Sequence, residues 1–168
     1  MEDKRIYLLA QFDEGTNKTL AEIYDKLVQA GLIGAQTKGI PYHFTLGSFD
    51  LDGESQVLER AQAVSHKTKA FDISLSHIGL FGLGVLFLAP SMNSELMNLH
   101  SDLVPDEEIC GCHQWVAHAT ILIDRPENIQ AAIPIVAQSF SPFAARIISI
   151  AAYEFFPQKF LAEYKFAH

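Results

Sequence analysis

Two short stretches of the sequence carry the same pair of polar residues at the same spacing. His43 and Thr45 lie in the segment PYHFTLGSF. His118 and Thr120 lie in the segment WVAHATILID, with the second histidine 75 residues after the first. Imidazole titrates near neutral pH, so one ring can accept a proton while a second donates one. Threonine hydroxyls can donate to an anionic oxygen, and the four side chains together therefore suit metal-independent chemistry at a phosphoryl group.

The spacing of each pair also predicts how the side chains are presented. Side chains of a β-strand alternate between its two faces, so a histidine and a threonine two positions apart point the same way. In the second stretch, this alternation places Val116 and Leu122 on the face of the motif residues. We expect the fold to bring the two strands together, with all four motif side chains lining one cleft.

The two halves of the chain predict the same succession of elements. Apolar periodicity and turn residues indicate strands over residues 4–12, 41–49, 71–80, 85–89, 115–124, 143–155 and 159–166. They indicate helices over residues 16–30, 55–68, 93–104 and 126–138. We therefore predict an α+β class fold that is bilobal and internally duplicated, with two antiparallel or mixed sheets around a central cleft and helices outside. The 168 residues are expected to form one domain with lobes at approximately 1–90 and 91–168.

The sequence resembles the 2H phosphoesterase superfamily, which includes the 2′-5′ RNA ligases and RNA 2′,3′-cyclic phosphodiesterases. The resemblance rests on the two motifs, HFTL and HATI, and on the order of elements along the chain. It implies metal-independent hydrolysis of a 2′,3′-cyclic phosphate, or of a related cyclic or 2′,5′-linked phosphodiester. It assigns His43 and His118 as the acid–base pair and Thr45 and Thr120 as donors to the phosphate, with no cofactor.

Residues next to the motifs are candidates for binding the substrate. Tyr42 and Trp115 are aromatic neighbours of the two motifs and could stack on a nucleobase, and Lys38 could offset phosphate charge. Phe81, Phe87, Phe155 and Phe156 are assigned to the core. The expected partner is a small nucleotide or an RNA end.

Charge and hydropathy limit the other partners. The net charge is −8 and the basic residues form no run, which argues against an extended nucleic-acid surface. The sequence shows neither an apolar stretch long enough to span a membrane nor a signal peptide, so a cytoplasmic protein without a membrane partner is expected. The oligomeric state is left open.

Two alternatives from other classes stay open at this point. A binding module could keep the same pocket and recognise a nucleotide or phosphate without turnover. A metal site could be built from Cys110, Cys112 and His113, with His100 or His118 as further ligands, although this spacing is narrower than that of known structural zinc sites.

Overall fold

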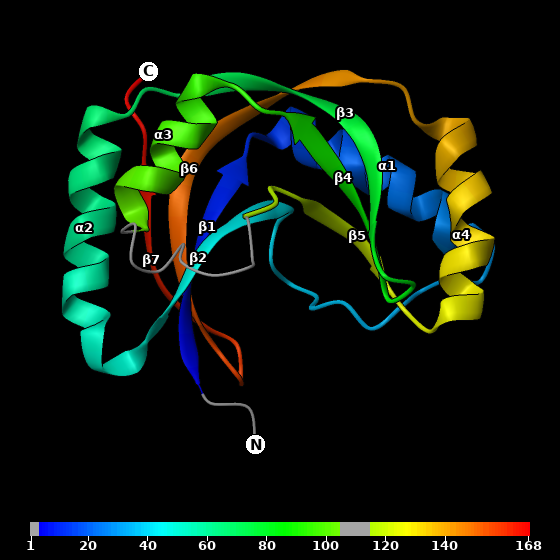
Figure 1. Ribbon diagram of the computed structural model, residues 1–168, viewed down its shortest axis with the longest axis horizontal. Coiled ribbons are helices and arrows are strands. Elements are labelled where there is room, and N and C mark those ends of the chain that lie inside the picture. The colour runs from blue at the N-terminus through cyan, green and yellow to red at the C-terminus, as the bar shows by residue number, and fades with distance from the viewer. Residues whose placement is uncertain (1–3, 105–114) are drawn as a thin grey trace.

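The computed structural model describes residues 4–104 and 115–168, which form four α-helices and seven strands (Figure 1). The strands are β1 (Arg5–Phe12), β2 (His43–Asp50), β3 (Phe71–Phe81), β4 (Val85–Ser91), β5 (Ala119–Ile123), β6 (Phe143–Phe155) and β7 (Lys159–Lys165). The helices are α1 (Glu14–Gln29), α2 (Glu54–Lys67), α3 (Ser94–Leu103) and α4 (Pro126–Ser139), and a short 3-10 helix, η1 (Leu51–Gly53), precedes α2. The predicted order of elements is therefore confirmed. The strand predicted from residue 115 begins instead at Ala119, where its pairing with β4 begins.

All seven strands belong to one open antiparallel sheet. Six of them follow the order β2-β1-β6-β3-β4-β5, and β7 pairs with β6 outside this path. The α+β class and the antiparallel pairing agree with the prediction. The expected pair of separate sheets is corrected to a single sheet.

The long strand β6 is the reason for the single sheet. Its first residues, 143–147, pair with β3, and its remaining residues, 147–155, pair with β1. One strand from the second half of the chain thus joins two strands from the first half. The strand pairing does not follow the predicted division into lobes at 1–90 and 91–168.

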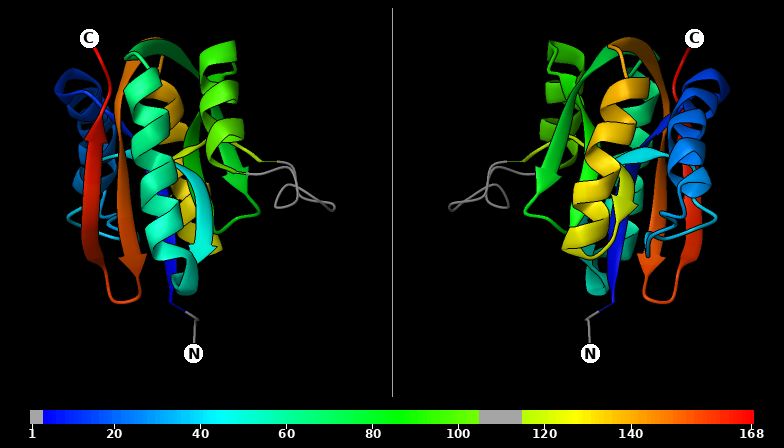
Figure 2. Two further views of the ribbon diagram at one scale, coloured as in Figure 1. Left: turned by 90° about the vertical axis from the view of Figure 1, so that its left-hand side faces the viewer. Right: turned by 90° about the vertical axis from the view of Figure 1, so that its right-hand side faces the viewer.

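Helices cover both halves of the bent sheet. Helices α2 and α3 pack on the half that contains β2 and β7, while α1 and α4 pack on the half that contains β4 and β5 (Figures 1 and 2). The first of these pairs brings α3 against the strand that carries the first motif. None of the helices in the described ranges is long and apolar enough to cross a membrane.

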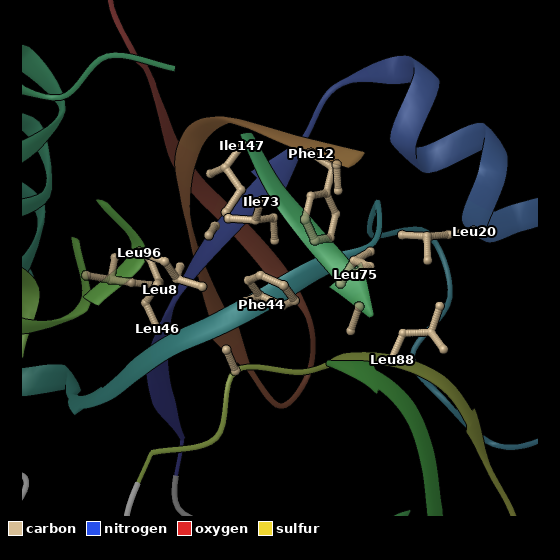
Figure 3. Close-up of a cluster of buried hydrophobic side chains, with 14 of the residues drawn as sticks. Leu8, Phe12, Leu20, Phe44, Leu46, Ile73, Leu75, Leu88, Leu96 and Ile147 are labelled. Atoms are coloured by element: carbon tan, nitrogen blue, oxygen red, sulfur yellow. The ribbon is translucent and has the colours of Figure 1, made fainter. Parts of the chain in front are cut away.

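Apolar side chains from the helices and the sheet form one large core. Figure 3 shows part of it, in which side chains from distant segments meet around Phe44 of β2. The ring of Phe44 contacts that of Phe12 edge-on, with centroids 5.0 Å apart. Phe44 is fully buried while its neighbours His43 and Thr45 are partly accessible, so burial of one face of β2 holds the other face toward solvent.

Candidate active site

The first motif lies at the start of β2, with its histidine held by its own backbone. Nδ1 of His43 is 2.9 Å from the carbonyl oxygen of Pro41, two residues upstream. A carbonyl can only accept a hydrogen bond, so Nδ1 must carry the proton. In the neutral ring this leaves the lone pair on Nε2, which is the atom free to accept a proton.

The second motif repeats this arrangement. Nδ1 of His118 is 2.7 Å from the carbonyl oxygen of Val116, again two residues upstream. The same argument places the proton on Nδ1 and the lone pair on Nε2. Each motif therefore presents an imidazole in the same tautomer.

A β-bulge follows the threonine in both motifs. On β2, Thr45 pairs with Leu9 and Gly47 with Leu8, which leaves Leu46 as the extra residue. The fourth residue of the motif is thus buried at a bulge rather than paired.

The bulge in β5 falls at the equivalent place. Thr120 pairs with Phe87 and Leu122 with Leu86, which leaves Ile121 unpaired. Both Ile121 and Leu122 are buried, so the strict alternation expected from the sequence ends at Thr120. The sequence had placed Leu122 on the accessible face of the motif residues, but in the structure Leu122 is buried and does not share that face.

The two motifs come from opposite ends of the strand order, β2 and β5, and the bend of the sheet brings them near each other. Burial lowers the pKa of His43 below its ordinary value of 6.5. The hydrogen bond to Pro41 partly opposes this, and the positive charge of a protonated His118 lowers the His43 pKa further. His43 is therefore neutral at pH 7.

A cavity of about 400 Å³ lies between the segment 36–43, which leads into β2, and β5. Its walls include His43 and Thr120, one residue from each motif, whereas Thr45 and His118, which were expected to line the same cleft, are not among its lining residues. Tyr42 and Lys38 also line this cavity. Two of the three predicted binding residues thus lie beside the first histidine.

The segment before β2 supplies the charge and donor properties of this cavity. Lys38 is the only lysine or arginine among the described residues that line it. Burial, with smaller contributions from Tyr24 and Asp25, raises the pKa of Tyr42 to about 12, so its phenol stays protonated. The backbone N–H of Tyr42 donates to Oδ1 of Asn17 at 2.9 Å, which ties this segment to α1.

Two phenylalanines surround the second histidine. The ring of Phe81 contacts His118 edge-on at 4.7 Å between centroids, and that of Phe87 lies at 5.3 Å. Phe87 is buried as expected, but Phe81 is 41% exposed. The assignment of Phe81 to the core is therefore corrected, because it lies where β3 ends and forms an apolar wall beside His118. The assignment of Phe156 is corrected as well, because it lies in the turn between β6 and β7 and is 54% exposed.

Trp115 lies away from the cavity that contains His43. Its ring stacks on His100 of α3, with centroids 3.9 Å apart and an interplanar angle of 3°. Both residues line a separate cavity between β2 and the helices α2 and α3. His100 lies on the buried face of α3 with Leu96, Leu99 and Leu103, and no signal in the sequence indicated its contact with Trp115.

The metal alternative falls largely outside the described residues, because Cys110, Cys112 and His113 lie in the range 105–114. Within residues 4–104 and 115–168, no group of three or more histidine, cysteine, aspartate or glutamate side chains could hold a metal ion. His100 and His118 each use Nδ1 in a hydrogen bond to a carbonyl.

Residues 19–155 match the family model of the 2′-5′ RNA ligase superfamily, and the match includes both motifs. The chain belongs to this superfamily. This confirms the resemblance to 2H phosphoesterases, and membership supports a phosphodiesterase-type activity. No curated protein matches the chain in a sequence comparison.

Solved structures of other proteins share the fold of this superfamily member. Apo E. coli LigT has a TM-score of 0.68 at 14% identity, and the alignment covers 100% of both chains. E. coli LigT complexed with 3′-AMP has a TM-score of 0.61 at 13% identity, again over 100% of both chains. The Thermus thermophilus protein TT0787 has a TM-score of 0.58 at 13% identity, and the alignment covers 98% of this chain and 100% of that protein. At these identities the likeness establishes the fold.

Proposed function

We propose that this protein is a metal-independent phosphodiesterase that hydrolyses 2′,3′-cyclic phosphates, or related cyclic or 2′,5′-linked phosphodiesters, in nucleotides or short RNA ends. One observation carries the proposal. Each motif holds its histidine through Nδ1 to the carbonyl two residues upstream, which leaves Nε2 of His43 and of His118 free for proton transfer. A pair of equivalent imidazoles fits a reaction that needs a base and an acid.

His43 is assigned as the base, because burial keeps its imidazole neutral at pH 7. Nε2 of His43 takes a proton from water as the water oxygen forms a bond to phosphorus. The bond from phosphorus to the 2′ or 3′ oxygen breaks, and protonated His118 donates a proton to the departing oxygen. The products are a phosphomonoester and a free hydroxyl, and no oxidant or co-reactant other than water is needed.

Thr45 and Thr120 are assigned as donors to the non-bridging phosphate oxygens. Each follows its histidine by two residues and is partly accessible, whereas the residue between them is buried. A hydroxyl that points at developing negative charge stabilises the transition state more than the ground state.

Tyr42 and Lys38 are assigned to substrate binding. Both line the cavity that contains His43 and Thr120, and a protonated phenol and an ammonium group can each donate to a phosphate or ribose oxygen. The fold-level likeness to E. coli LigT, solved with 3′-AMP and with phosphate, supports a small nucleotide as the ligand. The net charge of −8 supports a short rather than an extended nucleic-acid substrate.

The test is turnover of 2′,3′-cyclic mononucleotides and of a short RNA with a 2′,3′-cyclic phosphate end, measured in EDTA. Wild type and His118→Ala are compared side by side. EDTA-resistant hydrolysis that is lost in the variant supports the proposal, and the product identifies the oxygen that leaves. Binding of 3′-AMP without turnover of either substrate would instead favour the binding-module alternative.

A further inference from the structure

The outer edge of β2 presents two backbone carbonyls that need partners. β2 is the end strand of the sheet path, and among residues 4–104 and 115–168 only β1 pairs with it, so no described strand lies on its other edge. The bulge at Leu46 interrupts the regular alternation of the carbonyl groups along β2. As a result, the carbonyl groups of Thr45 and Leu46 both accept hydrogen bonds from side chains on the side of α3. A buried carbonyl without a donor would cost stability at the threonine of the first motif.

A stacked pair of side chains supplies both donors. Nε1 of Trp115 donates to the carbonyl oxygen of Thr45 at 3.0 Å. Nδ1 of His100 donates to the carbonyl oxygen of Leu46 at 2.8 Å. The two rings lie nearly parallel, and only 8% of His100 is exposed, so each ring restricts the movement of the other.

The bond from Trp115 also connects the two motifs directly. Trp115 precedes His118 by three residues in the same segment, while its acceptor belongs to the first motif. The strands β2 and β5 are at opposite ends of the sheet path, so the sheet itself does not join them by hydrogen bonds.

The other end of the second motif is tied to the segment that leads into β2. The backbone N–H of Ala35 donates to the carbonyl oxygen of Ile123 at 2.7 Å. The backbone N–H of Ile123 donates in turn to Oε1 of Gln36 at 3.1 Å. The segment from Trp115 to Ile123 is therefore held at both ends by residues that belong to, or lead into, the first motif.

We propose that Trp115 and His100 are positioning residues, which hold the Thr45–Leu46 backbone and set the separation between the two motifs. The catalytic consequence of this positioning rests on the proposed phosphodiesterase function. This role differs from stacking on a nucleobase, because one face of the Trp115 ring is covered by His100 and its N–H is used by Thr45.

The test compares wild type with two variants that keep an aromatic ring but remove one donor. Trp115→Phe removes the N–H that reaches Thr45, and His100→Phe removes the donor to Leu46. Ser65→Ala is the control, because it also removes a hydrogen bond made by a buried side chain, from Oγ to the carbonyl of Gln62 on α2, outside both motif segments.

The first measurement needs no substrate. Amide hydrogen exchange, followed by NMR, should become about fivefold faster in β2 around Thr45 in both aromatic variants, as expected when one hydrogen bond is lost. Exchange there should be unchanged in Ser65→Ala. If β2 exchanges in both aromatic variants as it does in wild type, the positioning role is wrong, whether or not the protein has the proposed activity.

The second measurement uses a 2′,3′-cyclic mononucleotide. Trp115→Phe should lower kcat about 10- to 100-fold, with KM changed by less than about twofold, because positioning errors act on the transition state. In a Thr45→Ala background the same change should lower kcat by a smaller factor, because the hydroxyl that the Thr45 backbone positions is absent, although the backbone carbonyl that accepts from Trp115 remains. Equal losses in both backgrounds, or a loss confined to KM, would overturn the proposal. If the wild type turns over neither this mononucleotide nor a short RNA with a 2′,3′-cyclic phosphate end, the proposed function fails and hydrogen exchange alone decides the positioning role.

Discussion

His43 and His118 repeat one hydrogen-bond arrangement, although the two residues lie 75 positions apart in the sequence and in segments at opposite ends of the strand order. Both rings carry the proton on Nδ1, held by the carbonyl two residues upstream. Equal tautomers in unequal surroundings allow the two imidazoles to take different parts in one proton transfer.

Removal of either imidazole should abolish most of the turnover. We expect His43→Ala and His118→Ala each to lower kcat by about 10²–10⁴-fold, the usual contribution of a positioned acid or base. The exposed His66 on α2 gives a matched control, and His66→Ala should retain wild-type kinetics. Steady-state kinetics with thermal melting of all three variants checks this. Near-full activity in a folded His43→Ala or His118→Ala protein would exclude the two-histidine mechanism.

The pH dependence of kcat/KM should reflect the lowered pKa of the base, His43. His43 must be neutral to accept a proton, and burial holds its pKa below 6.5. As the pH falls through this lowered pKa, His43 becomes protonated and kcat/KM should decrease. Activity should therefore persist below pH 6.5 before it declines. A kcat/KM profile checks the position of this acidic limb, and an inflection above pH 6.5 would contradict the assignment of His43 as the base.

Loss of a threonine hydroxyl should lower kcat less than loss of both histidines together, but more than loss of a surface side chain. Thr45→Ala and Thr120→Ala should each lower kcat by at most about 10²–10³-fold, as for one oxyanion donor. Serine keeps the hydroxyl, so Thr45→Ser and Thr120→Ser should recover most of the activity. If the serine variants are as slow as the alanine variants, the hydroxyl is not the group that matters.

A glycine at position 34 should be required for full stability, because the segment before β2 approaches β5 closely there. Its φ is +74°, and an added Cβ would lie 2.6 Å from Cδ1 of Leu122 and 2.8 Å from the carbonyl oxygen of Ile123. Gly34→Ala should therefore lower the free energy of unfolding by about 2–4 kcal/mol, from left-handed strain and crowding together.

Gly31 provides the control for this prediction. Its φ is +82°, but an added Cβ would meet no atom within 4 Å. Gly31→Ala should show the strain alone, about 1–2 kcal/mol. Denaturant unfolding of both variants measures the difference. Equal destabilisation would mean that the close approach to β5 contributes nothing.

Helix and strand positions followed from local patterns in the sequence. The helix predicted over residues 16–30 is α1, whose start is set two residues earlier because Oδ1 of Asp13 accepts from the N–H of Thr16. The strand predicted over residues 143–155 is β6 without change. Apolar spacing determines these elements because burial of one face requires it, whichever partner provides the burial.

Other features depended on contacts that no local pattern contains. The sequence could not show that β6 would join two halves of one sheet, since strand partners depend on the whole topology. It could not show that Phe81 is partly exposed and contacts His118, because an aromatic residue next to a glycine turn has the same local sequence pattern whether it is buried or exposed.

By itself, the sequence determined that His43 and Thr45 lie on one face of a strand, and that Thr120 lies on a second strand whose first residue directly follows His118. Period-2 alternation and buried neighbours such as Phe44 suffice for that. Only the tertiary structure decided the bulges after Thr45 and Thr120 and the partner of Trp115. These depend on which donor meets which carbonyl across the fold, and that pairing is a property of the assembled sheet and helices.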